Sequence, residues 1–109
     1  MSARDEQIGV NEALFREVNE RMEDLSRTFG NGQFTDFICE CGDAQCTERL
    51  QMSLAEYEAV RAEPTYFAVA EGHVVPDIER VVEKHDRYTV VEKVDPEAAQ
   101  AAEARDPRS

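Results

Sequence analysis

Three cysteines stand close together in the stretch Phe37-Ile-Cys-Glu-Cys-Gly-Asp-Ala-Gln-Cys-Thr-Glu48. The number of thiols is odd, with Cys39, Cys41 and Cys46, and the N-terminal residues lack the apolar segment of an export signal. We therefore do not expect a disulfide framework. Thiolates are soft metal ligands, and a sharp turn at Gly42 can direct three sulfurs at one ion. The stretch therefore predicts a metal site that fixes a small domain. The alternative is that the three cysteines are small apolar residues of the core.

A closed zinc site needs four ligands, so one ligand must come from another part of the chain. The chain has two histidines, His73 and His85. His73 follows Gly72 in an expected loop after a strand, where the backbone can approach closely, whereas His85 is expected at the end of a helix. We predict that one structural Zn²⁺ is held by Cys39, Cys41, Cys46 and His73.

Other interpretations of the same residues stay open. The carboxylates of Asp36, Glu40 and Asp43 are alternative fourth ligands, although carboxylates are less common in closed zinc sites. An iron–sulfur cluster is less favoured than zinc because it usually needs a fourth cysteine. A nucleophile pair such as Cys46 with His73 is also less favoured, because no third orienting residue stands near it in the sequence.

The length and the charge of the chain exclude several classes of protein. Its 109 residues fit one small domain, and 12 basic against 24 acidic residues leave a formal net charge of −12. A chain of this charge without clustered Lys and Arg is not expected to bind nucleic acid directly. The longest apolar runs are too short to span a bilayer, so we expect a cytoplasmic protein without a membrane segment.

Apolar residues recur at steps of three and four between residues 11 and 29, which predicts a long amphipathic helix. Asn11 suits the N-cap position and Gly30 the C-terminal end, so residues 1–10 are expected to form a flexible lead. We expect the apolar stripe of this helix to cover the sheet of the domain. The stripe consists of Leu14, Phe15, Val18, Met22, Leu25 and Phe29.

The middle of the chain predicts short strands and two short helices. A capping box of Ser53 and Glu56 starts a helix that ends before Pro64. A second helix is expected from Pro76, which fits a first helical turn, to His85. The expected strands cover residues 33–39, 47–52, 66–69 and 88–93.

The predicted fold class is α+β, in which the long N-terminal helix packs on a small, mostly antiparallel sheet with two short helices. One metal site is expected to join these elements. The domain is expected to span residues 11–94. Residues 95–109 are rich in alanine and offer nothing large to anchor them to a core, so a disordered tail is expected there. The predicted core contains Leu14, Phe15, Val18, Met22, Leu25, Phe37, Leu50, Leu54, Tyr57, Val60, Phe67, Val69, Ile78, Val81, Val82 and Val90.

The cysteine pattern and its surroundings resemble a group of short, uncharacterised bacterial proteins. The shared pattern is Cys-x-Cys-x4-Cys followed by a Gly-His pair, which here is Gly72 and His73. The resemblance covers residues 11–93 and includes the helix that starts at Asn11. The group has no assigned activity, so the resemblance supports the four ligands and implies no reaction.

These features predict a non-enzymatic zinc-binding protein that acts as a regulatory protein-interaction module. The alternative is a thiol-based redox or metal sensor that uses the same cysteines. A metal-dependent enzyme is less favoured, because the sequence shows neither an open ligand position nor a pocket. We expect a protein partner, no direct contact with nucleic acid or membrane, and a homodimer through the N-terminal helix as one form of the contact.

Overall fold

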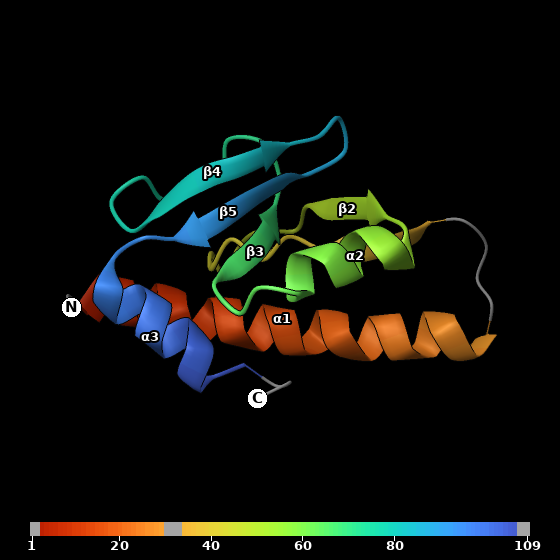
Figure 1. Cartoon of the computed structure of the whole chain (residues 1–109), viewed down its shortest axis with the longest axis horizontal. Helices are drawn as coiled ribbons and strands as arrows, with labels where there is room; N and C mark the ends of the chain where they lie inside the picture. The colour runs from red at the N-terminus through yellow and green to blue at the C-terminus, as the bar shows by residue number, and fades with distance from the viewer. Residues whose placement is uncertain (1–2, 30–33, 107–109) are drawn as a thin grey trace.

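The long helix α1 (Ala3–Phe29) runs along the whole length of the molecule, and the two sheets and α2 (Leu54–Arg61) lie on one side of it (Figure 1). The structure is a computed structural model that describes residues 3–29 and 34–106, with side chains from residue 7 to 27 and from 34 to 106. None of the helices in these ranges is long and apolar enough to cross a membrane.

Five strands form two antiparallel sheets in the described part of the chain. β1 (Thr35–Ile38) pairs with β2 (Arg49–Met52), and the second sheet has the strand order β3-β5-β4. The strands of the second sheet are β3 (Tyr66–Val69), β4 (Glu79–Lys84) and β5 (Thr89–Lys93). A third helix, α3 (Pro96–Ala104), lies against the N-terminal half of α1 (Figure 1). The predicted α+β class with a long N-terminal helix and two short helices is confirmed, although only α2 is one of the two short helices that were expected.

Local sequence signals place several elements where they were expected. The hydroxyl of Ser53 accepts a hydrogen bond of 3.1 Å from the N–H of Glu56, and the Glu56 carboxylate accepts one of 2.8 Å from the N–H of Ser53. This capping box starts α2, as predicted. β3 covers the predicted residues 66–69, and β1 and β2 lie within the predicted ranges 33–39 and 47–52.

The core lies between the two sheets and the helices. One cluster of buried side chains contains Phe37 and Tyr57, whose rings stack with their centroids 4.4 Å apart. A second cluster contains Phe67 together with Cys39 and Cys41. Two of the cysteines are therefore packed into the apolar interior, and the third lies at its edge.

Residues 76–85 form a turn and the edge strand β4, so the predicted helix in this range is wrong. β4 pairs with β5, with Val81 opposite Val91 and a register irregularity at Val82. Val81 and Val82 are β-branched, and such residues favour a strand when a neighbouring strand can pair with them. The spacing of Ile78 and the two valines fits a helix as well, and the pairing with β5 decides the outcome.

α1 begins at Ala3, well before the predicted start at Asn11, so residues 3–10 are helical and do not form a flexible lead. Asn11 is not an N-cap, because its side-chain amide donates a hydrogen bond of 2.7 Å to the carbonyl oxygen of Gly42. Ile8 packs against the same turn. These contacts with a distant loop hold the early turns of the helix, and local sequence does not reveal them. Residues 1–2 and the predicted helix end at Gly30 lie outside the described residues.

Residues 96–104 form α3, although they were expected to belong to a disordered tail. Asp95 caps this helix by accepting a hydrogen bond of 3.1 Å from the N–H of Ala98. Ala98 and Ala102 are buried, and their small side chains allow α3 to approach α1 closely. Arg16 of α1 donates a hydrogen bond of 2.8 Å to the carbonyl oxygen of Ala102 and so anchors the helix. Residues 107–109 lie outside the described residues.

α1 buries a polar side instead of the predicted apolar stripe. Leu14, Val18 and Leu25 are exposed, while Phe15 and Met22 are only partly buried. Val81 of β4 is exposed as well, so it does not belong to the core. The buried polar side chains of α1 are Glu12, Arg16, Asn19, Glu23 and Ser26. The side chain of Phe29 is not among those described.

Candidate metal centre

The structure brings together the four residues that the sequence predicted as ligands. One ligand atom from each of Cys39, Cys41, Cys46 and His73 lies within 4.8 Å of all the others. Cys39 and Cys41 are buried, and Cys46 and His73 are half-buried. This is the one group of three or more metal-ligating side chains found in the ranges 3–29 and 34–106.

The distances within the group match a tetrahedral zinc shell. Nδ1 of His73 lies 3.6 Å from the sulfur of Cys39 and 3.5 Å from that of Cys46. With sulfur about 2.3 Å and nitrogen about 2.0–2.1 Å from zinc, tetrahedral angles set a sulfur–nitrogen separation of about 3.5 Å. The His73 nitrogen and the sulfurs of Cys39 and Cys46 therefore already stand at the spacing that one ion requires.

Two turns present these ligands to one another. Cys39 follows β1, and its N–H donates a hydrogen bond of 3.2 Å to the carbonyl oxygen of Glu48 across the loop. Cys46 closes the loop with a bond of 3.0 Å from its N–H to the carbonyl oxygen of Asp43. His73 lies in the turn after β3, where its N–H donates a bond of 3.1 Å to the carbonyl oxygen of Ala70.

Glu40 stands between two ligands but does not join them. In extended backbone the side chains of consecutive residues point to opposite sides, so Cys39 and Cys41 share one side and Glu40 takes the other. Its fully buried carboxylate accepts hydrogen bonds from the Asn19 amide at 2.8 Å, the Tyr57 hydroxyl at 2.7 Å and the Ala68 N–H at 3.0 Å. Burial raises the pKa of Glu40, while these donors oppose the rise. Glu40 is therefore a support of the loop and not the alternative fourth ligand.

Asn19 of α1 is a supporting residue that the sequence did not single out. Its side chain donates a hydrogen bond of 2.9 Å to the carbonyl oxygen of Ile38 and accepts one of 2.9 Å from the N–H of Ile38. These bonds pair the side-chain amide with the backbone directly before Cys39. A polar residue in the middle of a helix gives no local sign of such a role, because its partner lies in another element.

The turn after Cys41 fits tightly against α1. Gly42 has a φ of +82°, and a Cβ atom at this position would lie 2.7 Å from Cγ2 of Ile8 and 2.9 Å from its carbonyl oxygen. Glycine is therefore required here both for the backbone conformation and for the close approach. The predicted sharp turn at Gly42 is confirmed.

Burial disfavours the thiolate form of two of the cysteines in the absence of an ion. Burial raises the pKa of the Cys39 thiol, and the Ala70 N–H, 3.1 Å from the sulfur, opposes the rise. Burial also raises the pKa of Cys41. A divalent ion supplies the positive charge that buried thiolates need, so its binding would release protons from these cysteines.

The remaining ligand candidates lie outside the group of four. His85 stacks on the ring of Tyr88 with centroids 4.3 Å apart, and its Nε2 lies 2.9 Å from a carboxylate oxygen of Glu83. The Asp43 carboxylate accepts a hydrogen bond of 2.9 Å from the N–H of Gln45. Asp36 is an exposed residue of β1. None of these three candidates belongs to the group of four.

An open groove passes the group on the side of Cys41 and His73. Gln7, Ile8 and Asn11 of α1 also line this groove. Solvent can therefore reach the side of the group that faces α1.

No family model, no curated protein and no solved structure matches the chain. The resemblance to a group of short bacterial proteins stays a prediction. The class of site, a Cys3His group that could hold a metal ion, rests on the geometry described above.

Proposed function

We propose that this protein is a non-enzymatic, zinc-stapled interaction module of the cytoplasm. One structural Zn²⁺ would be held by Cys39, Cys41, Cys46 and His73. The observation that carries the proposal is the separation of 3.5 and 3.6 Å between the His73 nitrogen and two cysteine sulfurs, which is that of a tetrahedral shell. Three thiolates and one imidazole are a donor set that zinc accepts in closed structural sites.

A structural role is favoured over a catalytic one by the number of protein ligands. A catalytic zinc usually keeps one position open for water or substrate, whereas four side chains converge here. Glu40, the carboxylate nearest in sequence to the ligands, points into the core and cannot reach a bound water as a general base. The ion would join the loop between β1 and β2 to the turn after β3, which are separate parts of a small domain.

The interaction role is supported by the outer surface of α1 and by the charge of the chain. Apolar side chains of α1 are exposed while its polar side is buried, which is the reverse of a helix that only covers its own domain. A net charge of −12 steers the protein away from nucleic acid. A regulatory function through contact with another protein is consistent with both features.

The test is the metal content of the protein purified without added metal. We expect about one zinc per chain by elemental analysis, and the Co²⁺-substituted protein should show the intense visible bands of tetrahedral thiolate coordination. His73→Ala should bind zinc more weakly, and His85→Ala is the matched control that should bind like the wild type. A protein without bound metal, or equal metal retention in the two variants, would overturn the proposal.

A thiol-based sensor is the second candidate, and the position of Cys46 favours it. Cys46 is half-buried at the edge of a group whose ligand atoms all lie within 4.8 Å, so an oxidant can reach a sulfur that has two others as neighbours. Peroxide would take two electrons from two zinc-bound thiolates and, with two protons from the solvent, would give one disulfide and two molecules of water, and zinc would leave. Cys39 and Cys41 are too close in sequence for an unstrained bridge, so Cys46 would be one partner.

The two candidates differ in their response to peroxide. A sensor releases zinc and loses helix content as Cys46 is oxidised, and a thiol reductant restores both. A purely structural site keeps its zinc at low-millimolar peroxide. Zinc release can be followed with a chromogenic chelator, and Cys46→Ser reports whether the release depends on that residue.

A further inference from the structure

The outward side of α1 carries a row of apolar side chains that nothing in the described chain covers. Val10, Leu14, Val18 and Leu25 are exposed by 42%, 54%, 38% and 56%. Their steps of four and seven residues place them on one side of the helix, and we call them the outer stripe. The row extends about 22 Å along the helix axis, at about 1.5 Å per residue.

α1 cannot rotate about its axis to bury the outer stripe against its own domain. Arg16 donates hydrogen bonds to the carbonyl oxygens of Pro64 and Ala102 and lies 4.5 Å over the ring of Phe67. Asn19 holds the backbone before Cys39, as described above. A rotation that buried the outer stripe would break these bonds and leave a buried arginine and amide without partners, which is strongly unfavourable. The outer stripe is therefore fixed toward the outside.

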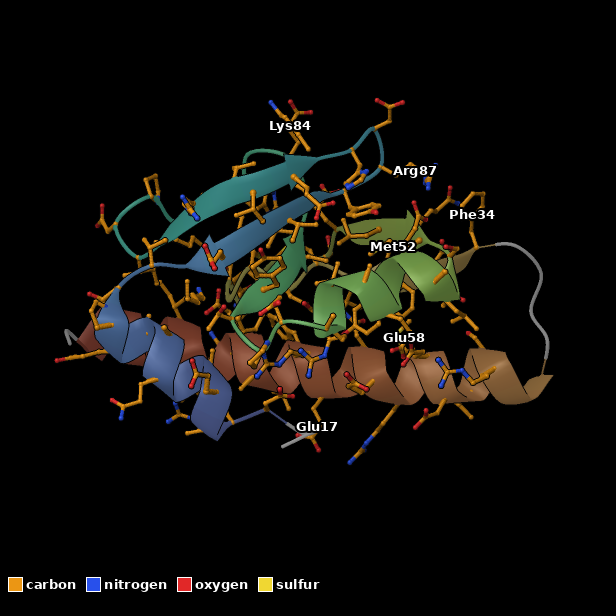
Figure 2. The ribbon with its side chains drawn as sticks, viewed as in Figure 1. Glu17, Phe34, Met52, Glu58, Lys84 and Arg87 are labelled. Carbon is orange, nitrogen blue, oxygen red and sulfur yellow. The ribbon has the colours of Figure 1, made fainter. Side chains whose placement is uncertain are left out.

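Two opposite charges lie beside the outer stripe. Arg21 and Glu17 pair at 3.2 Å on the surface of α1, with exposed fractions of 77% and 53%. Figure 2 shows Glu17 on the side of the helix turned away from the sheets. A partner of the stripe must therefore accept apolar contacts along its length and both signs of charge near its centre.

We propose that a second copy of this chain covers the outer stripe, with the two α1 helices antiparallel. A twofold axis between residues 17 and 18 places Val10 opposite the partner's Leu25 and Leu14 opposite the partner's Arg21. Arg21 then lies about 4.5 Å along the axis from the partner's Glu17, within reach of an ion pair that occurs twice in the dimer. A parallel pair would instead place like charges opposite each other, so charge complementarity selects the antiparallel arrangement.

The inference rests on the proposed interaction role, to which it gives a partner. It does not use the metal ligands. The metal content and the oligomeric state of one preparation can therefore fail independently.

The test is the mass of the zinc-loaded full chain by sedimentation equilibrium over micromolar to millimolar concentrations. We expect a monomer–dimer equilibrium in the wild type, and Leu14→Glu should raise the dimer dissociation constant at least about tenfold. Val81→Glu is the matched control, because Val81 is exposed to a similar degree, 45%, on β4, which Figure 1 shows separated from α1 by β5. This control should dimerise like the wild type.

Charge swaps test the antiparallel pairing itself. Glu17→Arg should weaken the dimer, because it places two arginines within reach of each other across the axis. The double variant Glu17→Arg, Arg21→Glu should restore the wild-type dissociation constant to within about threefold, since both charges are exchanged. A wild type that stays monomeric, a double variant no better than the single one, or equal effects of Leu14→Glu and Val81→Glu would overturn the proposal. The zinc content of the same samples shows separately whether the four proposed ligands bind the metal.

Discussion

The hydroxyl of Tyr57 donates a hydrogen bond of 2.7 Å to the carboxylate of Glu40, the residue between the first two cysteines of the candidate metal centre. Tyr57 stacks on Phe37 in the centre of the core. The cysteine loop is thus connected to the core by a side chain that points away from the ligands. A change in this connection should act on both the stability of the fold and the affinity for metal.

The first prediction concerns Glu40. Glu40→Gln replaces a carboxylate that accepts three hydrogen bonds with an amide whose NH2 group would face donors, so at least one buried donor loses its partner. We expect the free energy of unfolding to fall by about 2–3 kcal/mol and the zinc affinity to fall roughly tenfold or more. Urea unfolding and chelator competition measure the two effects. Glu48→Gln, on an exposed side chain of the same loop, should change neither, and equal effects of the two variants would contradict this role of Glu40.

A second prediction compares two glycines with the same backbone conformation. Gly42 and Gly72 both have a φ of +82°, but a Cβ atom meets Ile8 at 2.7 Å in the first case and nothing within 4 Å in the second. Gly72→Ala should therefore cost only the backbone strain, about 1 kcal/mol, whereas Gly42→Ala should cost roughly 3 kcal/mol or more. Thermal unfolding of the two variants provides the comparison. If both variants lose the same stability, the turn does not pack tightly on α1.

The third prediction is a dependence of stability on pH. Lys93 of β5 lies between two carboxylates, with its Nζ 2.5 Å from an oxygen of Glu12 and 2.5 Å from one of Glu79. Burial raises the pKa of Glu12 from 4.5 to about 7; the positive charge of Lys93 opposes this, and the charges of Glu79 and Glu40 add to it. Between pH 4.5 and about 7, Glu12 therefore keeps its proton in the folded chain and releases it in the unfolded chain. The free energy of unfolding should therefore fall as the pH rises from about 4.5 to 7.

Urea unfolding at saturating zinc isolates this effect of Glu12. Zinc binding has the opposite dependence, because acid protonates the thiolates, so the wild type must be compared with Glu12→Gln at each pH. Glu12→Gln has no carboxyl group to titrate, so it should not lose this stability. Its free energy of unfolding should therefore increase relative to that of the wild type as the pH rises. A difference that is constant between pH 5 and 8 would show that Glu12 keeps an ordinary pKa.

Removal of the metal should unfold part of the protein. If zinc is held as proposed, a chelator would leave buried thiols in the loop after β1 without an ion to join them to His73, and metal binding in such small domains contributes directly to folding. We expect the melting temperature to fall by more than about 10 °C, with recovery when zinc is returned. Cys41→Ser should behave like the stripped protein even with zinc present. A Cys41→Ser protein with unchanged melting temperature and metal content would falsify the structural role of the ion.

The grouping of Cys39, Cys41, Cys46 and His73 was open to prediction because it depends on residue chemistry and on turns that are local. Three thiolates within eight residues need a partner, and only two histidines exist in the chain. His73 could be preferred because it follows Gly72 in a turn after a strand, and His85 lies beyond the next strand. The capping box of α2 was visible for the same reason, since Ser53 and Glu56 satisfy each other.

The orientation of α1 could not be predicted from its periodicity. An apolar stripe normally faces the core, but here Arg16 and Asn19 find partners in loops that are far away in sequence. The gain from these hydrogen bonds exists only once the loops are in place, so no window of the sequence contains it. β4 and α3 were missed for a related reason. Pairing with β5 selects a strand for residues 79–84, and the contact with α1 orders an alanine-rich helix that has little stability alone.

The contact between Arg16 and the carbonyl oxygen of Ala102 joins residues 86 positions apart, and that between Lys93 and Glu12 joins residues 81 apart. During synthesis, these two contacts of α1 therefore cannot form until the chain has been made as far as Lys93 and Ala102. A nascent chain that ends before β5 lacks the partners Lys93 and Ala102, so Glu12 and Arg16 of α1 are more exposed to water. The protein should consequently acquire its final structure after translation of this region is complete, rather than progressively from its N-terminal helix.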